Sequence, residues 1–270
     1  MNIKISIITV SYNAVLAIEK TILSVLNQTY KNIEYIIIDG GSTDGTVDII
    51  KKYSTNISYW VSEPDKGIYD AMNKGILKAT GEYIQFLNAG DVIYSNKTIQ
   101  SIINKIPNIN NDVIYGDIAI EKKIGLYHFV PLKLETFQYR FPIYHPSTWV
   151  KSKILKEQKF DTSFKIAADF NFFRKIYFSK ATFYYTPLIF TIFEGEEGIS
   201  STNHKRLWLE KQIITRTTKL QIKKTIFYIK YEVKSLIKKM INKVRPNYLK
   251  ERDNNRFLKD SRIKGKIGLR

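Results

Sequence analysis

Asp39 most directly suggests chemistry in this sequence, because it ends an apolar run and precedes a glycine-rich turn. The run Ile36–Ile38 is typical of a buried parallel strand, and the segment 40–46 (Gly-Gly-Ser-Thr-Asp-Gly-Thr) follows at once. Open α/β sheets bind ligands at the carboxyl ends of their strands, and glycines let the backbone turn sharply there. A carboxylate at that edge suits a nucleotide base or ribose. Asp44, within the turn, either helps to bind the ligand or caps the following helix.

The first strand supports a nucleotide site but excludes two common kinds. Residues 5–10 form an apolar run followed by Ser11 and Asn13, and we expect Thr9 to face the same crevice as Asp39. The run is followed by neither G-x-G-x-x-G nor GxxxxGK(S/T). The glycine-rich phosphate cradles of dinucleotide-binding and P-loop proteins are therefore missing from this position.

Alternating strands and helices should position these side chains. Predicted strands cover residues 5–10, 33–39, 57–61, 83–87 and 113–120, and predicted helices cover about 15–27, 47–53, 68–78 and 98–105. Alternation at this spacing indicates right-handed βαβ units and a mainly parallel sheet. Further along, we expect a helix over 164–177, a strand over 182–193 and a helix near 203–219.

Length and composition limit the class of protein. At 270 residues the chain can bury a sizeable core. It has no cysteine, which excludes a disulfide framework, a zinc–cysteine site and a cysteine nucleophile. The sequence starts directly in the first strand without a signal-peptide pattern, and no apolar stretch reaches the roughly 18 residues of a membrane span. We therefore expect a cytoplasmic protein.

The basic charge is concentrated at the C-terminal end. The chain has a formal net charge of +18, and residues 205–270 hold 21 Lys and Arg against 5 Asp and Glu. From Ile222 to Val244, apolar residues recur at helical spacing with lysines between them, and Pro246 should end that helix. The polar, basic residues from Asn247 onward should be loosely ordered.

We divide the chain into a catalytic domain over 1–220 and a basic amphipathic helical tail over 221–270. Such a tail can bind nucleic acid, lie on an anionic membrane surface, or pack on the catalytic domain or a second subunit. Interleaved isoleucines and few aromatics after Tyr231 argue against a stacking platform for single strands. We expect no nucleic-acid partner, and the membrane surface and a homodimer through the tail helix both stay open.

Four blocks of the sequence, in this order, resemble inverting family 2 glycosyltransferases, which have a GT-A fold. The blocks are residues 5–13, 36–46, 62–75 and 86–91, and the resemblance runs from about Ile3 to Leu209. It implies an α/β fold of GT-A type with a Rossmann-like nucleotide-sugar half, about 1–120, and an acceptor half, about 121–220. It also implies an enzyme, a hexosyltransferase that inverts the anomeric carbon.

For the donor, the resemblance implies that Asp39 contacts the uracil of a UDP-sugar. Lys66 and Lys74 can pair with phosphate as point charges, although a surface role is open for Lys74. Family members often carry an arginine in this helix, where Met72 and Asn73 stand here. The full set of predicted donor-binding residues is Thr9, Ser11, Asn13, Asp39, Asp44, Lys66, Lys74, Asn88 and Asp91.

The last block occupies the position of the family's Asp-x-Asp motif. A divalent ion that bridges two phosphates prefers carboxylate oxygens. Asn88 and Gly90 stand where acids are expected, and Asp91 remains. The resemblance therefore implies Mg²⁺ or Mn²⁺ bound by Asp91, with weakened affinity. His145 and His204 could add a ligand, but a lone histidine is more often structural.

The segment 160–170 resembles the family segment in which an acid opens a helix. The usual Glu-Asp pair is Ala168-Asp169 here, so Asp169 is the predicted catalytic base. A helix N-terminus favours the carboxylate and keeps it ready to accept a proton. Ser200 and the helix through Trp208 should cover the acceptor side.

The function implied is transfer of a sugar from a nucleotide sugar to a glycan or polyprenyl-linked acceptor. Relatives build capsule, O-antigen or exopolysaccharide units, which would place this protein in the cytoplasm or at the inner face of the plasma membrane. One alternative, a sugar nucleotidyltransferase, would carry a Gly- and Arg-rich loop where Ser11-Tyr12-Asn13-Ala14 stands. The other is a noncatalytic protein that binds through its basic tail.

Overall fold

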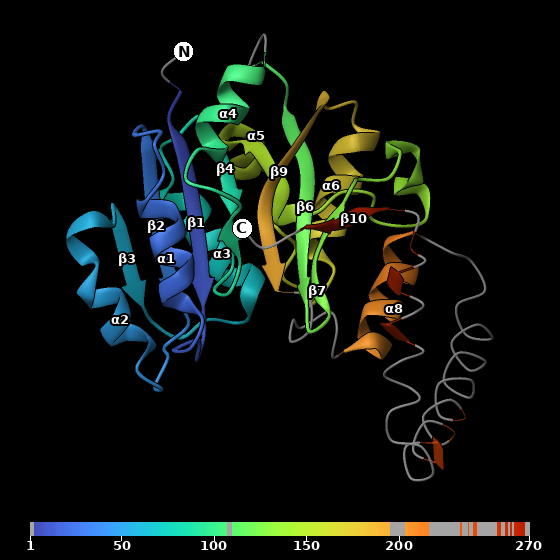
Figure 1. The fold of residues 1–270 in the computed structure, drawn as a ribbon, viewed down its shortest axis with the longest axis horizontal. Coiled ribbons are helices and arrows are strands. Elements are labelled where there is room, and N and C mark those ends of the chain that lie inside the picture. The colour runs from blue at the N-terminus through green and yellow to red at the C-terminus, as the bar shows by residue number, and fades with distance from the viewer. Residues whose placement is uncertain are drawn as a thin grey trace.

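A single curled sheet with helices on both faces forms the body of the molecule (Figure 1). The structure, a computed structural model, describes residues 3–106, 110–194, 203–215 and 262–267, and the single residues 233, 237, 240, 241, 253, 254, 257, 258 and 260. The strand order is β10-β7-β6-β8-β4-β1-β2-β3, and β9 pairs with β6 and β5. The predicted α/β class is confirmed.

The N-terminal half is parallel, as predicted. Its strands are β1 (Ile5–Ser11), β2 (Ile33–Asp39), β3 (Tyr59–Ser62) and β4 (Tyr83–Phe86), and its helices are α1 (Ile18–Leu26), α2 (Thr46–Lys52) and α3 (Ile68–Lys78). β1 pairs in parallel with β2 and β4, and β2 with β3. Every residue of β1 is buried, because helices cover both faces of the sheet.

The C-terminal half is mainly antiparallel, which the alternation of the first 120 residues did not predict. Its elements are β5 (Val92–Ile93), α4 (Thr98–Lys105), β6 (Val113–Lys122), β7 (Gly125–Phe129), β8 (Thr148–Lys151), α5 (Ser152–Gln158), α6 (Ala168–Phe178), β9 (Phe183–Glu194), α8 (His204–Ile214) and β10 (Ile263–Ile267). β8 runs antiparallel to both β4 and β6 and so joins the two halves, while β9 is parallel to β6.

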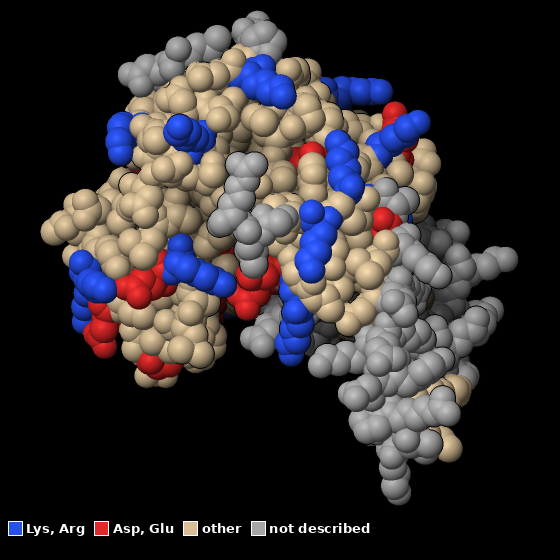
Figure 2. Space-filling view, in the orientation of Figure 1, with Lys and Arg blue, Asp and Glu red and all other residues tan. Residues whose placement is uncertain are grey.

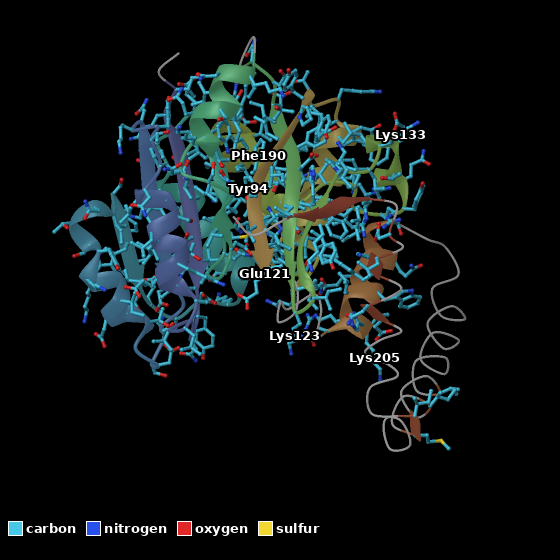
Figure 3. All side chains as sticks on the ribbon, viewed as in Figure 1. Tyr94, Glu121, Lys123, Lys133, Phe190 and Lys205 are labelled. Atoms are coloured by element: carbon cyan, nitrogen blue, oxygen red, sulfur yellow. The ribbon has the colours of Figure 1, made fainter. Side chains whose placement is uncertain are left out.

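Two cores lie on opposite faces of the sheet because side chains alternate along each strand. On β1, Ile8 and Val10 pack with α3 and α6, whereas Ile5 and Ile7 pack with α1 and α4. α3 lies so close to β1 that a Cβ at Gly75 would come within 2.5 Å of Ile8. The second core continues into the C-terminal half through fully buried residues such as Phe190 of β9, near the middle of the sheet (Figure 3).

The C-terminal segment corrects one expectation. Residues 263–267 were expected to be loosely ordered, but they form β10, which pairs antiparallel with β7. Alternating Ile263 and Ile267 with glycine and lysine gives no strong strand pattern, so the pairing depends on the exposed edge of β7. Phe257 packs on Tyr127 and Phe129 of that strand with ring centroids 5.1 and 5.5 Å apart.

Most of the predicted tail helix, Ile222–Val244, lies outside the described residues, as does Ser200. Val233 and Ile237 are described and each expose 48% of their surface. Among the described residues, no helix is both long and apolar enough to cross a bilayer. Lys and Arg side chains are scattered over the described surface in the view of Figure 2, with acidic side chains among them.

Candidate active site

The carboxyl ends of β1, β2 and β3 meet at one edge of the sheet, where Asp39 organises the turns. Ser11 is opposite Asp39 in the ladder, and Asp39 is opposite Ser62. The Asp39 carboxylate accepts the hydroxyls of Ser11 (2.8 Å), Ser42 (2.6 Å) and Ser62 (2.7 Å). It also accepts the N–H groups of Gly41 (3.1 Å) and Ser42 (2.8 Å). Burial raises the pKa of Asp39, but these hydrogen bonds outweigh burial and lower it below its usual value.

The five donors give Asp39 a role in shaping the glycine-rich turn, which sequence reasoning did not identify. Asn13 ties the same turn to the end of β1. Its side-chain oxygen accepts the N–H of Thr43 at 3.0 Å, and its N–H donates to Ser42 Oγ at 2.7 Å. Asn13 itself has a φ of +46°, a left-handed conformation that asparagine tolerates better than most residues. The edge is therefore a prearranged set of backbone turns.

Two of the predicted donor residues have structural partners. Thr9 is fully buried and its hydroxyl lies 3.1 Å from that of Tyr35, so it packs inside the sheet instead of facing the crevice. Asp44 accepts the N–H and hydroxyl of Thr46, the first residue of α2, at 3.0 and 2.6 Å. The bond from the Thr46 hydroxyl lowers the pKa of Asp44. Asp44 therefore bonds to the first residue of α2 from the position before the N-cap Gly45, and its role in donor binding stays a prediction.

The two predicted phosphate-binding lysines differ. Lys74 forms a 2.8 Å ion pair with Glu63 and donates to the carbonyl of Pro64 at 3.0 Å, and the bond to Glu63 raises its pKa. These contacts hold the loop before α3, so a phosphate group would have to compete with Glu63 and the Pro64 carbonyl for the Lys74 ammonium group. Lys66 is exposed near the end of the same loop, just before Gly67.

The end of β4 presents two buried oxygens without partners. Asn88 Oδ1 and Asp91 Oδ2 are both shielded from solvent and accept no hydrogen bond. Burial raises the pKa of Asp91 to about 7. The turn between them is fixed by Thr21 of α1, whose hydroxyl accepts the N–H of Gly90 at 2.9 Å and donates to the carbonyl of Asp91 at 2.8 Å. Unsatisfied buried oxygens are costly, so this pair is a place where a ligand would be stabilising.

The residues at this edge fit a hard divalent ion in part. Carboxylate and amide oxygens are the ligands that Mg²⁺ and Mn²⁺ prefer. Glu194 lies nearby at the end of β9, with Oε2 2.9 Å from where a Cβ of Gly90 would stand, and pairs with Lys20 at 3.3 Å. However, no group of three or more His, Cys, Asp or Glu in the described part of the chain could hold a metal. Such an ion would need phosphate oxygens to complete its shell.

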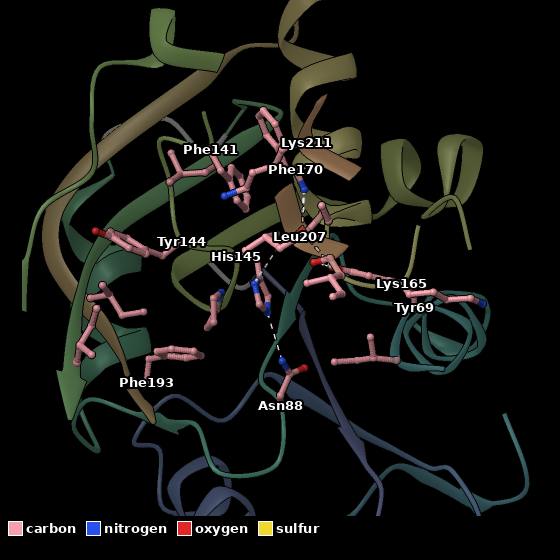
Figure 4. Close-up of a pocket in the computed structure, with 18 of the residues that line it drawn as sticks. Tyr69, Asn88, Phe141, Tyr144, His145, Lys165, Phe170, Phe193, Leu207 and Lys211 are labelled. Carbon is pink, nitrogen blue, oxygen red and sulfur yellow. Dashed lines mark hydrogen bonds and ion pairs between the residues drawn. The ribbon is translucent and has the colours of Figure 1, made fainter. Parts of the chain in front are cut away.

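A pocket of about 400 Å³ adjoins Asn88 and contains Asp169 (Figure 4). Asp169 is in the first turn of α6 and lies 3.3 Å from His145, whose other ring nitrogen is 3.4 Å from the Asn88 amide. The Tyr69 hydroxyl lies 3.0 Å from Asp169 Oδ1 and 2.8 Å from the carbonyl of Ile166. Burial and the Asp169 carboxylate raise the pKa of Tyr69, so the phenol stays a hydrogen-bond donor.

His145 is thus the residue that sequence reasoning undervalued, because it joins Asn88 to Asp169. Its position comes from the proline-containing turn before β8, which brings residues from the C-terminal half against the strand ends. The Tyr144-His145-Pro146 sequence marked a turn, but a turn alone does not reveal which strand edge it will approach. His204, by contrast, is exposed at the start of α8.

Glu210 of α8 is a second residue that the sequence did not indicate. It is buried, and its carboxylate accepts the N–H groups of Lys165 (2.9 Å), Ile166 (2.9 Å) and Ala167 (3.0 Å). Burial raises its pKa, but the Lys165 N–H and Arg206 outweigh burial and lower it below the usual value. We predicted that residues 164–167 begin the helix. They form instead the loop that Glu210 fixes before α6.

The acceptor side of the pocket is built from α8 and the C-terminal segment. Trp208 was expected to cover it, but the α8 residues that line the pocket are Leu207 and Lys211. Arg262, just before β10, also lines it and is held by Asp260 through two bonds of 2.9 and 2.5 Å. Arg262 therefore brings the C-terminal segment to the pocket.

A family model for glycosyl transferase family 2 matches residues 6–179, which is more than half of the chain. The chain belongs to this family. It is 31% identical over 174 residues to an uncharacterized glycosyltransferase of Mycobacterium tuberculosis, covering 62% of this chain and 66% of that protein. It is 34% identical over 119 residues to a PGL/p-HBAD biosynthesis glycosyltransferase of Mycobacterium bovis, covering 43% of this chain and 46% of that protein.

Solved structures show the same GT-A fold. TarS 1–349 of S. aureus in complex with UDP-GlcNAc has a TM-score of 0.63 at 19% identity, covering 78% of this chain and 65% of that one. The mannosyltransferase PcManGT of Pyrobaculum calidifontis, in complex with GDP-Man and Mn²⁺, has a TM-score of 0.60 at 16% identity, covering 79% and 63%. The chain thus spans two thirds or less of the length of these relatives.

Proposed function

We propose that the protein transfers a sugar from a nucleotide sugar, with UDP as the first nucleotide to test, to a hydroxyl of a glycan or lipid-linked acceptor, with inversion. The observation that carries the proposal is the position of Asp169 in a pocket that opens onto the end of β4. One wall supplies a base and the adjoining strand edge supplies unsatisfied oxygens, as transfer from a diphosphate leaving group requires.

Asp169 would take the proton of the acceptor hydroxyl as the oxygen attacks the anomeric carbon. Tyr69 and His145 hold the carboxylate from two sides, which leaves little freedom for it to turn away from the pocket. Attack from the pocket side, opposite the departing diphosphate, inverts the configuration of that carbon.

On the donor side, the turns held by Asp39 and Asn13 would receive the nucleoside. The support is the set of five donors around Asp39, which keeps the turn rigid without a ligand. The solved relatives are complexes with UDP, UDP-GlcNAc and GDP-Man. We test UDP first because the family resemblance places Asp39, at the end of β2, against the uracil.

A Mg²⁺ or Mn²⁺ ion would be held by Asp91 together with the amide oxygen of Asn88 and the diphosphate. Such an ion, when bound, neutralises charge that develops on the leaving diphosphate. The support is the pair of unpartnered buried oxygens and the chemistry of oxygen ligands. With Asp91 as the only carboxylate of the turn from Asn88 to Asp91, metal should bind weakly until the nucleotide is present.

The cellular setting is also a proposal. A role in surface polysaccharide assembly, such as capsule or O-antigen, at the cytoplasmic face of the membrane agrees with the basic tail. The tail helix would rest on anionic lipid, and dimerisation through it is the competing arrangement. The family match favours transfer over a nucleotidyltransferase or a noncatalytic binding protein.

A donor screen tests the function. The protein is incubated with Mn²⁺ and a panel of UDP- and GDP-sugars, and the melting temperature and release of free nucleotide are measured. We expect at least one UDP-sugar to raise the melting temperature and to be slowly hydrolysed. A shift with GDP-sugars alone would refute the uridine assignment, and no shift with any nucleotide sugar would refute the function.

A further inference from the structure

Glu194, at the end of β9, lies against the turn in which glycine stands at a position where an acid is expected. β5 and β9 pair antiparallel with Val92 opposite Ile192, and continuing this register by two residues brings Glu194 across from Gly90. Gly90 has a φ of +106°, a backbone conformation that residues with a side chain rarely adopt. A Cβ on Gly90 would stand 2.9 Å from Glu194 Oε2. The Glu194 carboxylate therefore lies where a side chain of residue 90 would begin.

Two oxygens of the same turn are buried and have no partner. Asp91 is 3% exposed, and its Oδ2, like the Oδ1 of Asn88, accepts no hydrogen bond from the described part of the chain. Burial is the main cause that raises the pKa of Asp91, and the negative charge of Glu194 adds to it. The two carboxylates are thus close enough to interact, and a cation bound by both would relieve their repulsion.

The ion pair that Glu194 forms in this structure is an exposed one. Lys20 of α1 lies 3.3 Å from Glu194 Oε2, and the two side chains are 44% and 41% exposed. Such a pair contributes little to stability, because water screens the charges and two flexible side chains must be ordered. A divalent ion bound by Asp91 and the diphosphate can therefore compete with Lys20 for the Glu194 carboxylate.

We propose that Glu194 supplies, from β9, the carboxylate that position 90 lacks, and that it binds the divalent ion together with Asp91 and Asn88. This rests on the proposed function, since it assigns a further ligand to the ion that would hold the leaving diphosphate. Two protein carboxylates leave the other ligand positions to phosphate oxygens and water, in agreement with the absence of any group of three or more His, Cys, Asp or Glu suited to a metal among the described residues.

Mn²⁺ binding tests the proposal independently of turnover. The full-length protein is titrated with Mn²⁺, alone and with saturating UDP, and free Mn²⁺ is followed by its electron paramagnetic resonance signal. A blank with UDP alone corrects for the ion held by the nucleotide itself. Glu194→Gln keeps the size of the side chain but removes its charge. We expect it to weaken Mn²⁺ affinity in the UDP complex about tenfold or more, since the affinity of oxygen sites depends on the number of charged ligands.

Two further variants separate ligation from other roles of Glu194. Glu121→Gln is the matched control for a lost charge, because Glu121 is opposite Glu194 in the β6–β9 ladder, is exposed, and lies one strand further from Gly90. It should change Mn²⁺ affinity about twofold or less, because its charge acts through solvent and salt. Lys20→Gln breaks the same ion pair from the other side. Without nucleotide it should leave Mn²⁺ affinity unchanged or increase it, because a competing cation is removed.

Mn²⁺ affinity as in the wild type for Glu194→Gln, or no Mn²⁺ binding by the wild type in either titration, would overturn the proposal. An equal loss in Glu121→Gln would overturn it in favour of a general charge effect, and an equal loss in Lys20→Gln in favour of a structural ion pair. The thermal shift given by UDP with Mn²⁺ is recorded for each protein. If the wild type shows no such shift, the proposed function fails as well, whereas a wild-type shift with unaffected Mn²⁺ binding in Glu194→Gln refutes only the role of Glu194.

Discussion

Burial of Asp91 links the stability of the protein to pH in a way that can be measured. The side chain is 3% exposed, and burial raises its pKa from 3.8 to about 7. A rise of about 3 units corresponds to about 4 kcal/mol of preference for the protonated form in the folded state. Because the folded pKa lies above the unfolded one, this contribution is fully present below pH 3.8 and is lost as the pH rises to about 7.

We predict that Asp91→Asn removes this loss of stability at rising pH, because the asparagine side chain cannot ionise. In chelator and without nucleotide, the free energy of unfolding of the variant relative to wild type should grow by about 1.4 kcal/mol per pH unit between about pH 5 and pH 7, then level off. Urea unfolding at half-unit pH steps measures the difference. Asp48→Asn is the control, because the Asp48 side chain is 83% exposed and should give a flat difference.

The same substitution should stabilise the protein but weaken the binding of UDP with Mn²⁺. Asp91→Asn removes the buried carboxylate expected to hold the metal, so the rise in melting temperature given by UDP with Mn²⁺ should be lost. A variant that is less stable than wild type at pH 8, or a difference independent of pH, would refute the reasoning about the buried charge. A full Mn²⁺-dependent UDP shift would remove Asp91 from the metal site.

Three further predictions concern the parts around this edge. Asp39→Ala should abolish the UDP thermal shift because five hydrogen bonds are lost, three of them to the glycine-rich turn, and a full shift would exclude that turn from the donor site. Glu210→Gln should lower the rate of nucleotide release from the donor by about ten- to a hundredfold with an unchanged UDP shift, because the loop before Asp169 loosens. Arg206→Gln should have a much smaller effect on that rate. Equal effects of the two substitutions would contradict the role of Glu210 in fixing this loop. Val233→Asp combined with Ile237→Asp should abolish flotation with anionic liposomes while UDP still binds, and persistent flotation would refute an anchor through these side chains.

The structure also decides how the tail can be tested. Deleting the chain from Gln221 onward would remove β10 and Arg262, which belongs to the pocket. Such a deletion would confuse loss of the anchor with damage to the site. Point substitutions at described, exposed positions avoid that confusion.

The parallel half of the sheet was predictable because its sequence signals are local. Strands buried on both faces give continuous apolar runs, and Asp39 with its glycines marks where one of them ends. The antiparallel half was not predictable, since β7, β8 and β10 are short and their pairing depends on which strand edges the rest of the sheet leaves open. β10 in particular forms because β7 leaves an edge to pair with.

The residues of the site followed the same division. Asp39, Asn88 and Asp91 could be proposed from the sequence because each lies at or just after the end of a strand, and Asp169 because it opens a helix. His145 and Glu210 could not, because each acts through a contact with a distant segment. Glu210 reads as an ordinary helix residue, and its three N–H donors come from a loop more than forty residues earlier.

Asp169→Asn tests the central claim most directly, with donor consumption and UDP binding measured on the same protein. The amide keeps the size of the side chain but cannot accept the acceptor's proton. We predict a fall in transfer, or in donor hydrolysis where no acceptor is known, of about a hundredfold or more, with UDP affinity nearly unchanged. Turnover near that of the wild type would contradict Asp169 as the base, and would direct attention to Asp70 and Asp161.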